Sequence, residues 1–164
     1  SLDFDNGWNL VHVPDTAPEW VAEIVTSTVQ SMEAVFDLDD ISTAGMGSLH
    51  VPSGGHTSWL HLDEDFSRSI SFRAPVSRSS SKQLILEEGW NVVGLPGFKS
   101  ANASSITVTY GDDTVSLDDA LSARLLDTGL LSFKDGDYMA AETVLPFRAY
   151  FVRARKPCTL NLPW

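Results

Sequence analysis

The letters Gly-Trp-Asn occur twice in this chain of 164 residues, first from Gly7 and again from Gly89. The surrounding stretches, GWNLVHVP and GWNVVGLP, keep nearly the same order of residue types and both end at a proline. Such a recurrence indicates an internal duplication, which limits the fold to two related units. We therefore expect two diverged repeats, residues 1–82 and 83–164, that pack as one body.

Each letter of the repeated motif has a structural explanation. The glycines follow acidic turn letters, and glycine permits the positive φ at which a hairpin reverses. The asparagines are suited to tying a turn through side-chain to backbone hydrogen bonds. The tryptophans are expected to be core or half-buried anchors. The residues assigned to this framework are Gly7, Trp8, Asn9, Gly89, Trp90 and Asn91.

Other segments also recur around the motif. Residues 66–75 (FSRSISFRAP) and 147–157 (FRAYFVRARKP) are both short alternating stretches that close on a proline. Residues 82–90 and 156–164 both run from lysine to tryptophan over nine letters. We expect the members of each pair to occupy equivalent places in the two repeats.

The middles of the two repeats differ. Apolar residues over 17–36 recur at helical spacing, although β-branched residues there would also suit a strand. In the second repeat, ITVTYGDDTVSL predicts a hairpin, and capping-box spacing at Ser116 and Asp119 predicts the start of a helix. A further turn is predicted at residues 135–137. The predicted fold is mainly β, an antiparallel sandwich or barrel-like body with about one short helix per repeat.

Composition excludes several classes of partner. The formal net charge is −11, and such a surface repels phosphate backbones and anionic lipid, so we expect no nucleic-acid partner. The apolar runs are shorter than the roughly 20 residues of a membrane helix, which predicts no membrane insertion. Cys158 is the single cysteine, so a disulfide within the chain is excluded and the thiol is expected to fill the core.

The second repeat resembles a known module. Its LEEGWNVVGLP and the later LPFRAYFVRARKPCTLNL are similar to the GWN-type β-rich accessory modules of large secreted and cell-surface proteins of bacteria and archaea. The first repeat departs from this pattern, because FSRSISFRAP lacks the tyrosine–aromatic pair. The resemblance implies a secreted or cell-surface location beside enzymes or adhesins, with sugar binding in some members. Because the chain begins without methionine, we also expect it to be a segment of a longer polypeptide with flanking domains.

The four histidines, His12, His50, His56 and His61, all lie in the first repeat. Three of them share a short segment with Asp63, and imidazole with carboxylate suits zinc or a similar ion. The spacing matches no established zinc pattern, so exposed loop histidines are the favoured interpretation. Recurring acidic pairs leave a calcium site between loops open, although turns and helix caps explain most of them. We expect no cofactor, with zinc or calcium as the lesser alternative.

Motifs for catalysis are missing from the sequence. It contains no GxSxG, no GxxxxGK[ST] and no GxGxxG. No pair of carboxylates is singled out by an apolar environment, as glycoside hydrolysis would require. We therefore expect a protein that is not an enzyme.

Aromatic residues outside the motif are the best candidates for a binding site. Carbohydrate modules stack sugar faces on exposed rings and bond the hydroxyl groups with polar side chains. Trp59 leads, because its Gly/Ser/Thr/His-rich loop has little apolar periodicity to explain a tryptophan. For Trp20 packing within a helix is the favoured role. For Tyr110 and Tyr138 packing at a strand edge is at least as good an explanation as ligand binding. The candidate ligand-binding residues are Trp59, His61, Asp63, Tyr110, Asp112, Tyr138 and Trp20.

The sequence thus favours a non-catalytic carbohydrate-binding module whose partners are a polysaccharide or glycan and the flanking domains. A structural spacer or adhesin domain with protein partners is the main alternative. A metal-binding domain that uses His50, His56, His61 and Asp63 is the third interpretation.

Overall fold

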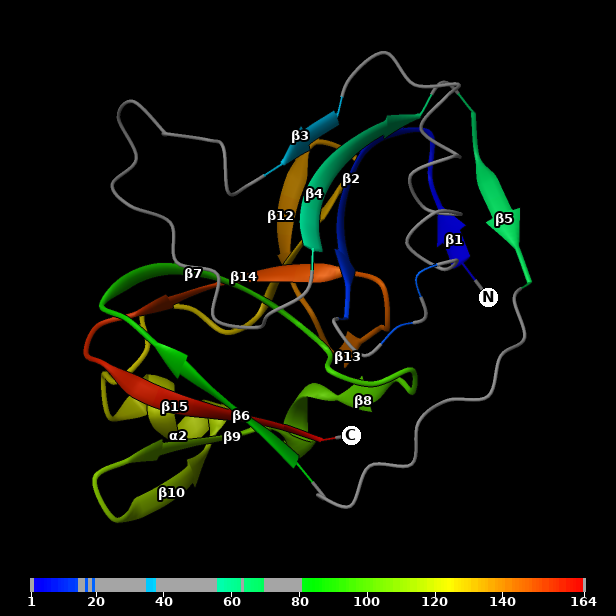
Figure 1. Ribbon diagram of the computed structural model, residues 1–164. Coiled ribbons are helices and arrows are strands. Elements are labelled where there is room, and N and C mark those ends of the chain that lie inside the picture. Colours follow the sequence, from blue (N-terminus) through cyan, green and yellow to red (C-terminus); the bar gives the residue numbers. More distant parts are fainter. Residues whose placement is uncertain are drawn as a thin grey trace.

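The computed structural model describes residues 2–14, 17, 19, 35–37, 56–62, 64–69 and 81–163. Strands dominate this part of the chain, as Figure 1 shows. In chain order they are β1 (Leu2–Phe4), β2 (Gly7–Val13), β3 (Val35–Asp37), β4 (His56–Leu62), β5 (Phe66–Arg68), β6 (Ser81–Leu86), β7 (Gly89–Gly94), β8 (Ala101–Asn102), β9 (Thr107–Tyr110), β10 (Asp113–Ser116), β11 (Leu131–Lys134), β12 (Asp137–Ala140), β13 (Thr143–Val144), β14 (Ala149–Ala154) and β15 (Cys158–Pro163). Two short helices lie among them, η2 (Ala103–Ser105) and α2 (Leu117–Ser122). The strands of each described pair run antiparallel, which confirms the predicted mainly β fold.

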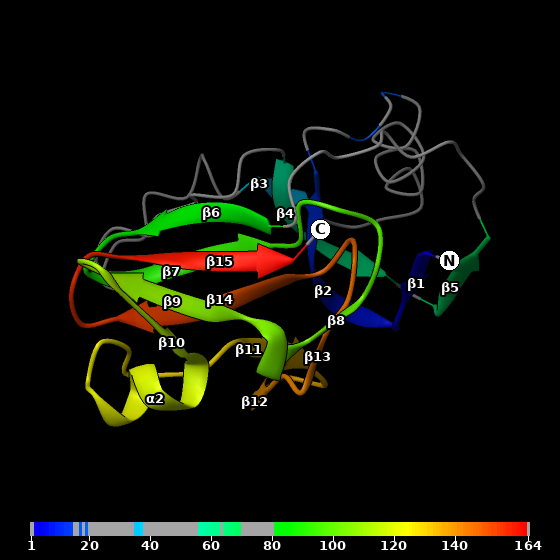
Figure 2. The same cartoon turned by 90° about the horizontal axis from the view of Figure 1, so that it is seen from below.

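The second half contains two four-stranded sheets. One has the order β10-β9-β15-β6 and the other β12-β11-β14-β7. Their inward-facing side chains form the largest core, in which Leu84, Val108 and Leu160 of the first sheet join Val93 and Val152 of the second. α2 closes one end of this core beside β9 and β10 (Figure 2), because its apolar face is buried there. The arrangement is a β-sandwich-like body.

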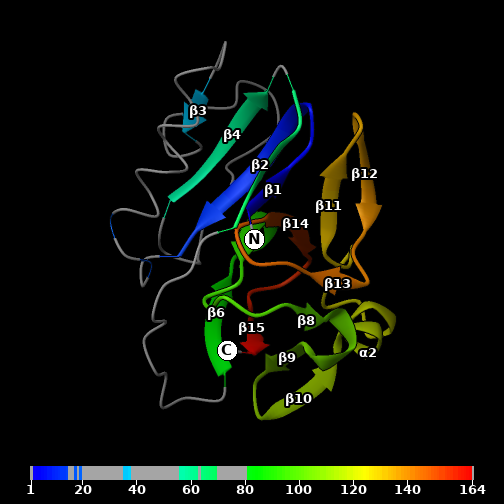
Figure 3. The same ribbon diagram turned by 90° about the vertical axis from the view of Figure 1, so that its right-hand side faces the viewer.

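The first half adds a three-stranded sheet, β2-β4-β3, and a two-stranded one, β1-β5. Figure 3 shows the larger of these sheets alongside the β11–β12 hairpin. At the contact, Val11 forms an isolated bridge with Arg148, and the His12 backbone N–H donates to the Phe147 carbonyl at 3.4 Å. A small apolar cluster that includes Leu10 and Val92 is buried between the halves. The two halves therefore share packed surface.

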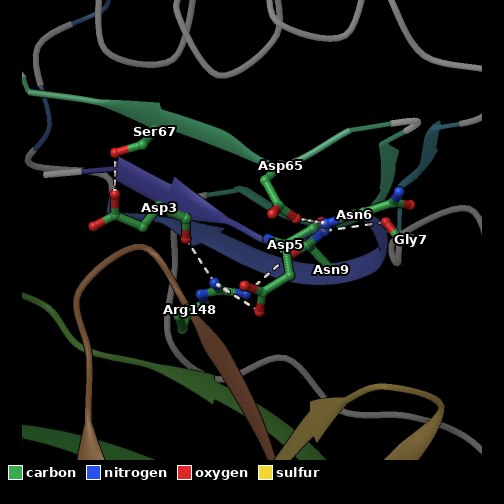
Figure 4. Close-up of polar contacts among 8 residues, drawn as sticks. All are labelled: Asp3, Asp5, Asn6, Gly7, Asn9, Asp65, Ser67 and Arg148. Atoms are coloured by element: carbon green, nitrogen blue, oxygen red, sulfur yellow. Dashed lines mark hydrogen bonds and ion pairs between the residues drawn. The ribbon is translucent and has the colours of Figure 1, made fainter.

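Arg148 joins the halves through its side chain (Figure 4). Its guanidinium donates to Asn9 Oδ1 at 2.9 Å and to the Asp3 carbonyl at 2.6 Å, and it lies 3.9 Å from the Asp5 carboxylate. The same group lies 5.2 Å from the centre of the Phe4 ring. Burial lowers the pKa of this guanidinium, and the nearby Asp5 carboxylate opposes that effect. One arginine of the second half thus binds the first turn of the chain.

The two GWN turns are built by the same hydrogen bonds. Asn91 Nδ2 donates to the carbonyls of Glu87 (2.9 Å) and Gly89 (3.1 Å), and the Glu87 N–H donates to Asn91 Oδ1 (3.0 Å). Asn9 makes the corresponding bonds with the residues four and two positions before it, at 2.7, 3.1 and 3.2 Å. φ is 91° at Gly7 and 106° at Gly89, a conformation that glycine adopts without strain. Both asparagines are buried, so each turn is tied from inside.

Strand pairing is the same around both turns. β1 with β5 and β2 with β4 in the first half correspond to β6 with β15 and β7 with β14 in the second. The motif glycine lies opposite the last residue of the paired strand in each case, Leu62 in one half and Ala154 in the other. Such a correspondence is what a duplication would produce. The boundary expected after residue 82 falls inside β6.

The expected equivalence of residues 66–75 and 147–157 is wrong. β4, not β5, is the strand that pairs with β2 as β14 pairs with β7. Residues 82–90 and 156–164 are also not equivalent, because β6 and β15 are partners in one ladder, with Leu84 opposite Leu160. The Phe, Arg, Lys and Trp residues that these segments share do not determine their place in a sheet, because that place depends on pairing with strands far away in the sequence.

The predicted turns of the second half are present. Gly111 and Asp112 form the two-residue loop between β9 and β10, and Asp135 and Gly136 form the loop between β11 and β12. φ is positive at both Asp135 (54°) and Gly136 (87°), as a type I′ hairpin turn requires. The strands on either side of each turn are therefore held in a fixed register.

The predicted helix at the end of the first hairpin is also present as α2. Ser116 Oγ accepts from the Asp119 N–H at 3.1 Å and donates to the Asp119 carboxylate at 2.8 Å. In the first half, the helix expected over residues 17–36 lies mostly outside the described residues. The helix prediction is wrong at positions 35 and 36, because Val35–Asp37 is strand β3, paired with β4.

Cys158 lies buried at the start of β15 among the core side chains. Burial raises the pKa of its thiol, since an apolar environment disfavours the thiolate. The cysteine therefore acts as core filling, as expected.

Candidate functional site

Six aromatic rings, one from each of six strands, meet where the two halves touch. We call this group the aromatic cluster. Its members are Trp8 (β2), Trp59 (β4), Trp90 (β7), Phe133 (β11), Tyr138 (β12) and Phe151 (β14). Because these strands come from both halves, the cluster exists only in the folded chain.

Trp59 lies at the centre of the cluster. Its ring centroid is 4.9 Å from that of Phe133, 6.2 Å from Phe151 and 6.4 Å from Trp8. Tyr138 completes one side, 5.2 Å from Phe133 and 5.5 Å from Phe151. Most of these contacts are edge-to-face, a geometry that stabilises a pair by about 0.5–1.5 kcal/mol beyond the area it buries. The inner rings are therefore held rigidly.

Two rings of the cluster are exposed, and the other four are half-buried. Tyr138 is 54% exposed and Trp8 is 40% exposed, so Trp8 is not the core or half-buried anchor that the sequence predicts. Partial burial raises the pKa of the Tyr138 phenol above its ordinary value. An exposed apolar surface on a rigid base is thus presented at the junction of the halves.

Trp59 itself does not lie in a loop. It is in β4, opposite Leu10 of β2 and Phe36 of β3, and it is half-buried. The Ser-Gly-Gly letters that suggested a loop precede β4 in the sequence. β4 is paired with β2 on one side and β3 on the other, and this central position accounts for a large aromatic residue at Trp59. The ring of Trp59 supports the exposed Trp8 ring directly, and Phe133 and Phe151 link it to Tyr138.

His61 lies in β4 and is half-buried, so for this residue the favoured interpretation as an exposed loop histidine is wrong; its ring centroid is 5.0 Å from that of Trp8. His50, Asp63 and Trp20 lie outside the described residues, and His56 is described only as part of β4. The metal site predicted from this segment therefore stays a prediction. Within the described residues, no three His, Cys, Asp or Glu side chains are grouped to hold a metal ion.

His12 has a packing role. It is 1% exposed, its Nδ1 lies 2.9 Å from Thr57 Oγ1, and its ring covers Gly94. A Cβ on Gly94 would collide with that ring, and Gly94 stands in the second motif where His12 stands in the first. His12 and His61 face opposite ends of the β2–β4 ladder, four residues or about 13 Å apart, too far to share one ion.

Tyr110 and Asp112 belong to a different place in the molecule. Both are exposed at the β9–β10 turn, and the Lys156 ammonium lies 5.7 Å from the centre of the Tyr110 ring. Figures 1 and 3 place this hairpin far from β12. The structure therefore does not bring Tyr110 and Asp112 together with Tyr138 and Trp59.

The cluster residues that sequence reasoning missed are Phe133, Phe151 and the exposed face of Trp8. The alternation of apolar and polar residues in their strands is visible in the sequence, but alternation does not show which strands lie side by side.

No family model, curated protein or solved structure matches this chain. No helix among the described residues is long and apolar enough to cross a membrane.

Proposed function

We propose that this chain is a non-catalytic carbohydrate-binding module of a longer secreted or cell-surface protein. The observation that carries the proposal is the pair of exposed rings, Trp8 and Tyr138, fixed on the half-buried rings of the aromatic cluster. Sugars present flat C–H faces to aromatic rings, and a ring that is already held loses little entropy when a ligand stacks on it. His61 of β4, whose ring centroid is 5.0 Å from that of Trp8, supplies a hydrogen-bonding group beside the exposed rings.

The test is an insoluble-polysaccharide pull-down and a glycan array with matched variants. Tyr138→Ala is expected to weaken binding roughly tenfold, since one stacked ring contributes about 1–2 kcal/mol. Tyr110→Ala is the control, because Tyr110 is also an exposed hairpin tyrosine and lies outside the cluster. Retained binding by Tyr138→Ala would contradict the proposal, and loss on adding EDTA would favour the metal site instead.

A structural spacer or adhesin domain is the second candidate. It is favoured by the packing of Trp59, Phe133 and Phe151 against one another between the halves, which is a structural use of aromatic residues. A spacer predicts no binding to any polysaccharide by the wild-type protein. It also predicts that Tyr138→Ala changes only stability.

A further inference from the structure

A polar hollow of about 440 Å³ opens beside the motif turn of the second half. It is lined by Glu88, Gly89, Asp127, Arg153, Ala154 and Arg155, and we call it the arginine hollow. Gly89 and Ala154 are opposite one another in β7 and β14, so the floor is sheet backbone. Its charged groups come from the ends of these strands and from the segment before β11.

One carboxylate organises two guanidinium groups in this hollow. Arg155 Nε donates to Asp127 Oδ1 at 2.7 Å, and a terminal nitrogen of Arg155 lies 2.6 Å from the same oxygen. Arg153 Nε lies 3.6 Å from Asp127 Oδ2. Backbone bonds hold Asp127 in place, because its N–H donates to the Arg153 carbonyl at 2.8 Å. The arginine side chains are 52% and 50% exposed, so both reach solvent.

Arg155 is hydrogen-bonded to Asp127 at short distance, whereas Arg153 approaches the same carboxylate only loosely. A half-exposed ion pair at 3.6 Å contributes little to stability. Among the described residues, the terminal nitrogens of Arg153 donate no hydrogen bond. The terminal nitrogens of the planar guanidinium group are the donors that bind carboxylate or sulfate groups in a bidentate manner.

The hollow continues into the aromatic cluster. The Arg153 guanidinium lies 5.8 Å from the centre of the Trp90 ring, and Trp90 is 6.3 Å from Phe151, which in turn contacts Tyr138. A row of aromatic rings therefore runs from the exposed tyrosine to the exposed arginine. A glycan of more than one unit that stacks on Tyr138 has the hollow on its path.

The arginine hollow also lies at the most basic segment of the sequence. The chain carries a net charge of −11, yet Arg153, Arg155 and Lys156 stand within four positions. They are 3 of the 11 basic residues and form the densest basic segment of the sequence. Lys156 lies over the Tyr110 ring and outside the lining, so Arg153 and Arg155, beside the carboxylates of Glu88 and Asp127, are the cations that an anionic group would meet in the hollow.

We propose that the arginine hollow binds the anionic group, carboxylate or sulfate, of an acidic glycan. This inference rests on the carbohydrate-binding function proposed above and adds the class of glycan. Arg153 supplies the fork that receives the anion, and Asp127 and Arg155 hold that fork in position. Trp90 and the rest of the aromatic cluster receive the sugar rings.

The experiment measures affinity for matched polymers by calorimetry at two salt concentrations. Polygalacturonate is compared with its methyl ester, and dextran sulfate with dextran, so that the carboxylate and sulfate sources are separated. Wild type is expected to bind at least one acidic polymer roughly tenfold more tightly than its neutral partner. Arg153→Gln is expected to remove that difference, and Arg153→Lys to restore only part of it.

Arg124→Gln is the matched control, because Arg124 is exposed and lies outside the hollow. Equal losses in Arg124→Gln and Arg153→Gln would show general attraction to polyanions and overturn the inference. If wild type binds acidic and neutral polymers with equal affinity and binding still depends on Tyr138, anion binding by the arginine hollow is overturned and the carbohydrate-binding function is kept. Failure to bind any polymer would overturn both.

Discussion

Asn91 is a buried polar side chain whose three hydrogen bonds all go to the turn it encloses. Replacing it with alanine leaves the Glu87 N–H and two carbonyls without that partner, in a space that water does not reach freely. We expect Asn91→Ala to lower the free energy of unfolding by about 2–3 kcal/mol, measured by urea denaturation. Asn102→Ala, at an exposed asparagine, is the control and should change it by less than about 0.5 kcal/mol. Equal effects would show that the bonds of the motif asparagine do not matter.

Single-residue roles were the easiest to predict where they depend on near neighbours in sequence. The motif asparagine bonds within four residues, and the Ser116 cap bonds within three, so both are visible as spacing. Trp59 and Trp8 depend instead on which strands lie beside them, and for these two the expected burial or location was wrong.

The β11–β12 hairpin determines where Tyr138 is presented. Its turn needs positive φ at Gly136, where any Cβ is strained although the space around it is open. Gly136→Ala is expected to lower the free energy of unfolding by about 1 kcal/mol and to weaken glycan binding through the disturbed hairpin. Urea denaturation and calorimetry measure the two effects.

Gly129→Ala is the matched control for that change. Gly129 also has open space around it but does not have positive φ, so alanine there should be neutral or slightly stabilising. If both variants lost the same stability, the loss would come from chain flexibility and not from turn conformation.

Elements joined by tight turns could be predicted, and elements joined by long connections could not. ITVTYGDDTVSL contains its own two-residue loop, so its pairing is local. β4 and β14 pair with strands far away in sequence, and their letters, HTSWLHL and AYFVRA, share almost no residue types. The candidate site shows the same limit, because its six rings come from six separate strands.

The contact between the halves depends on long-range groups that no local pattern predicts. Arg148 binds the Asp3 carbonyl and Asn9 Oδ1 across more than 100 positions of sequence. The cluster around Trp59 adds apolar contact at the same junction. If these contacts couple the halves, the chain unfolds as one cooperative unit.

Arg148→Gln tests that coupling. The variant removes a half-buried charge and its hydrogen bonds, and we expect it to lower the free energy of unfolding by about 2–3 kcal/mol. Arg148→Lys should recover only a small part, because an ammonium group cannot bind two acceptors with the planar fork of arginine. Tryptophan fluorescence and far-ultraviolet circular dichroism, followed together in urea, distinguish one transition from two. Coincident transitions in wild type that separate in Arg148→Gln would show that this arginine couples the halves, whereas separate transitions already in wild type, or an effect no larger than that of Arg124→Gln, would show two independent units.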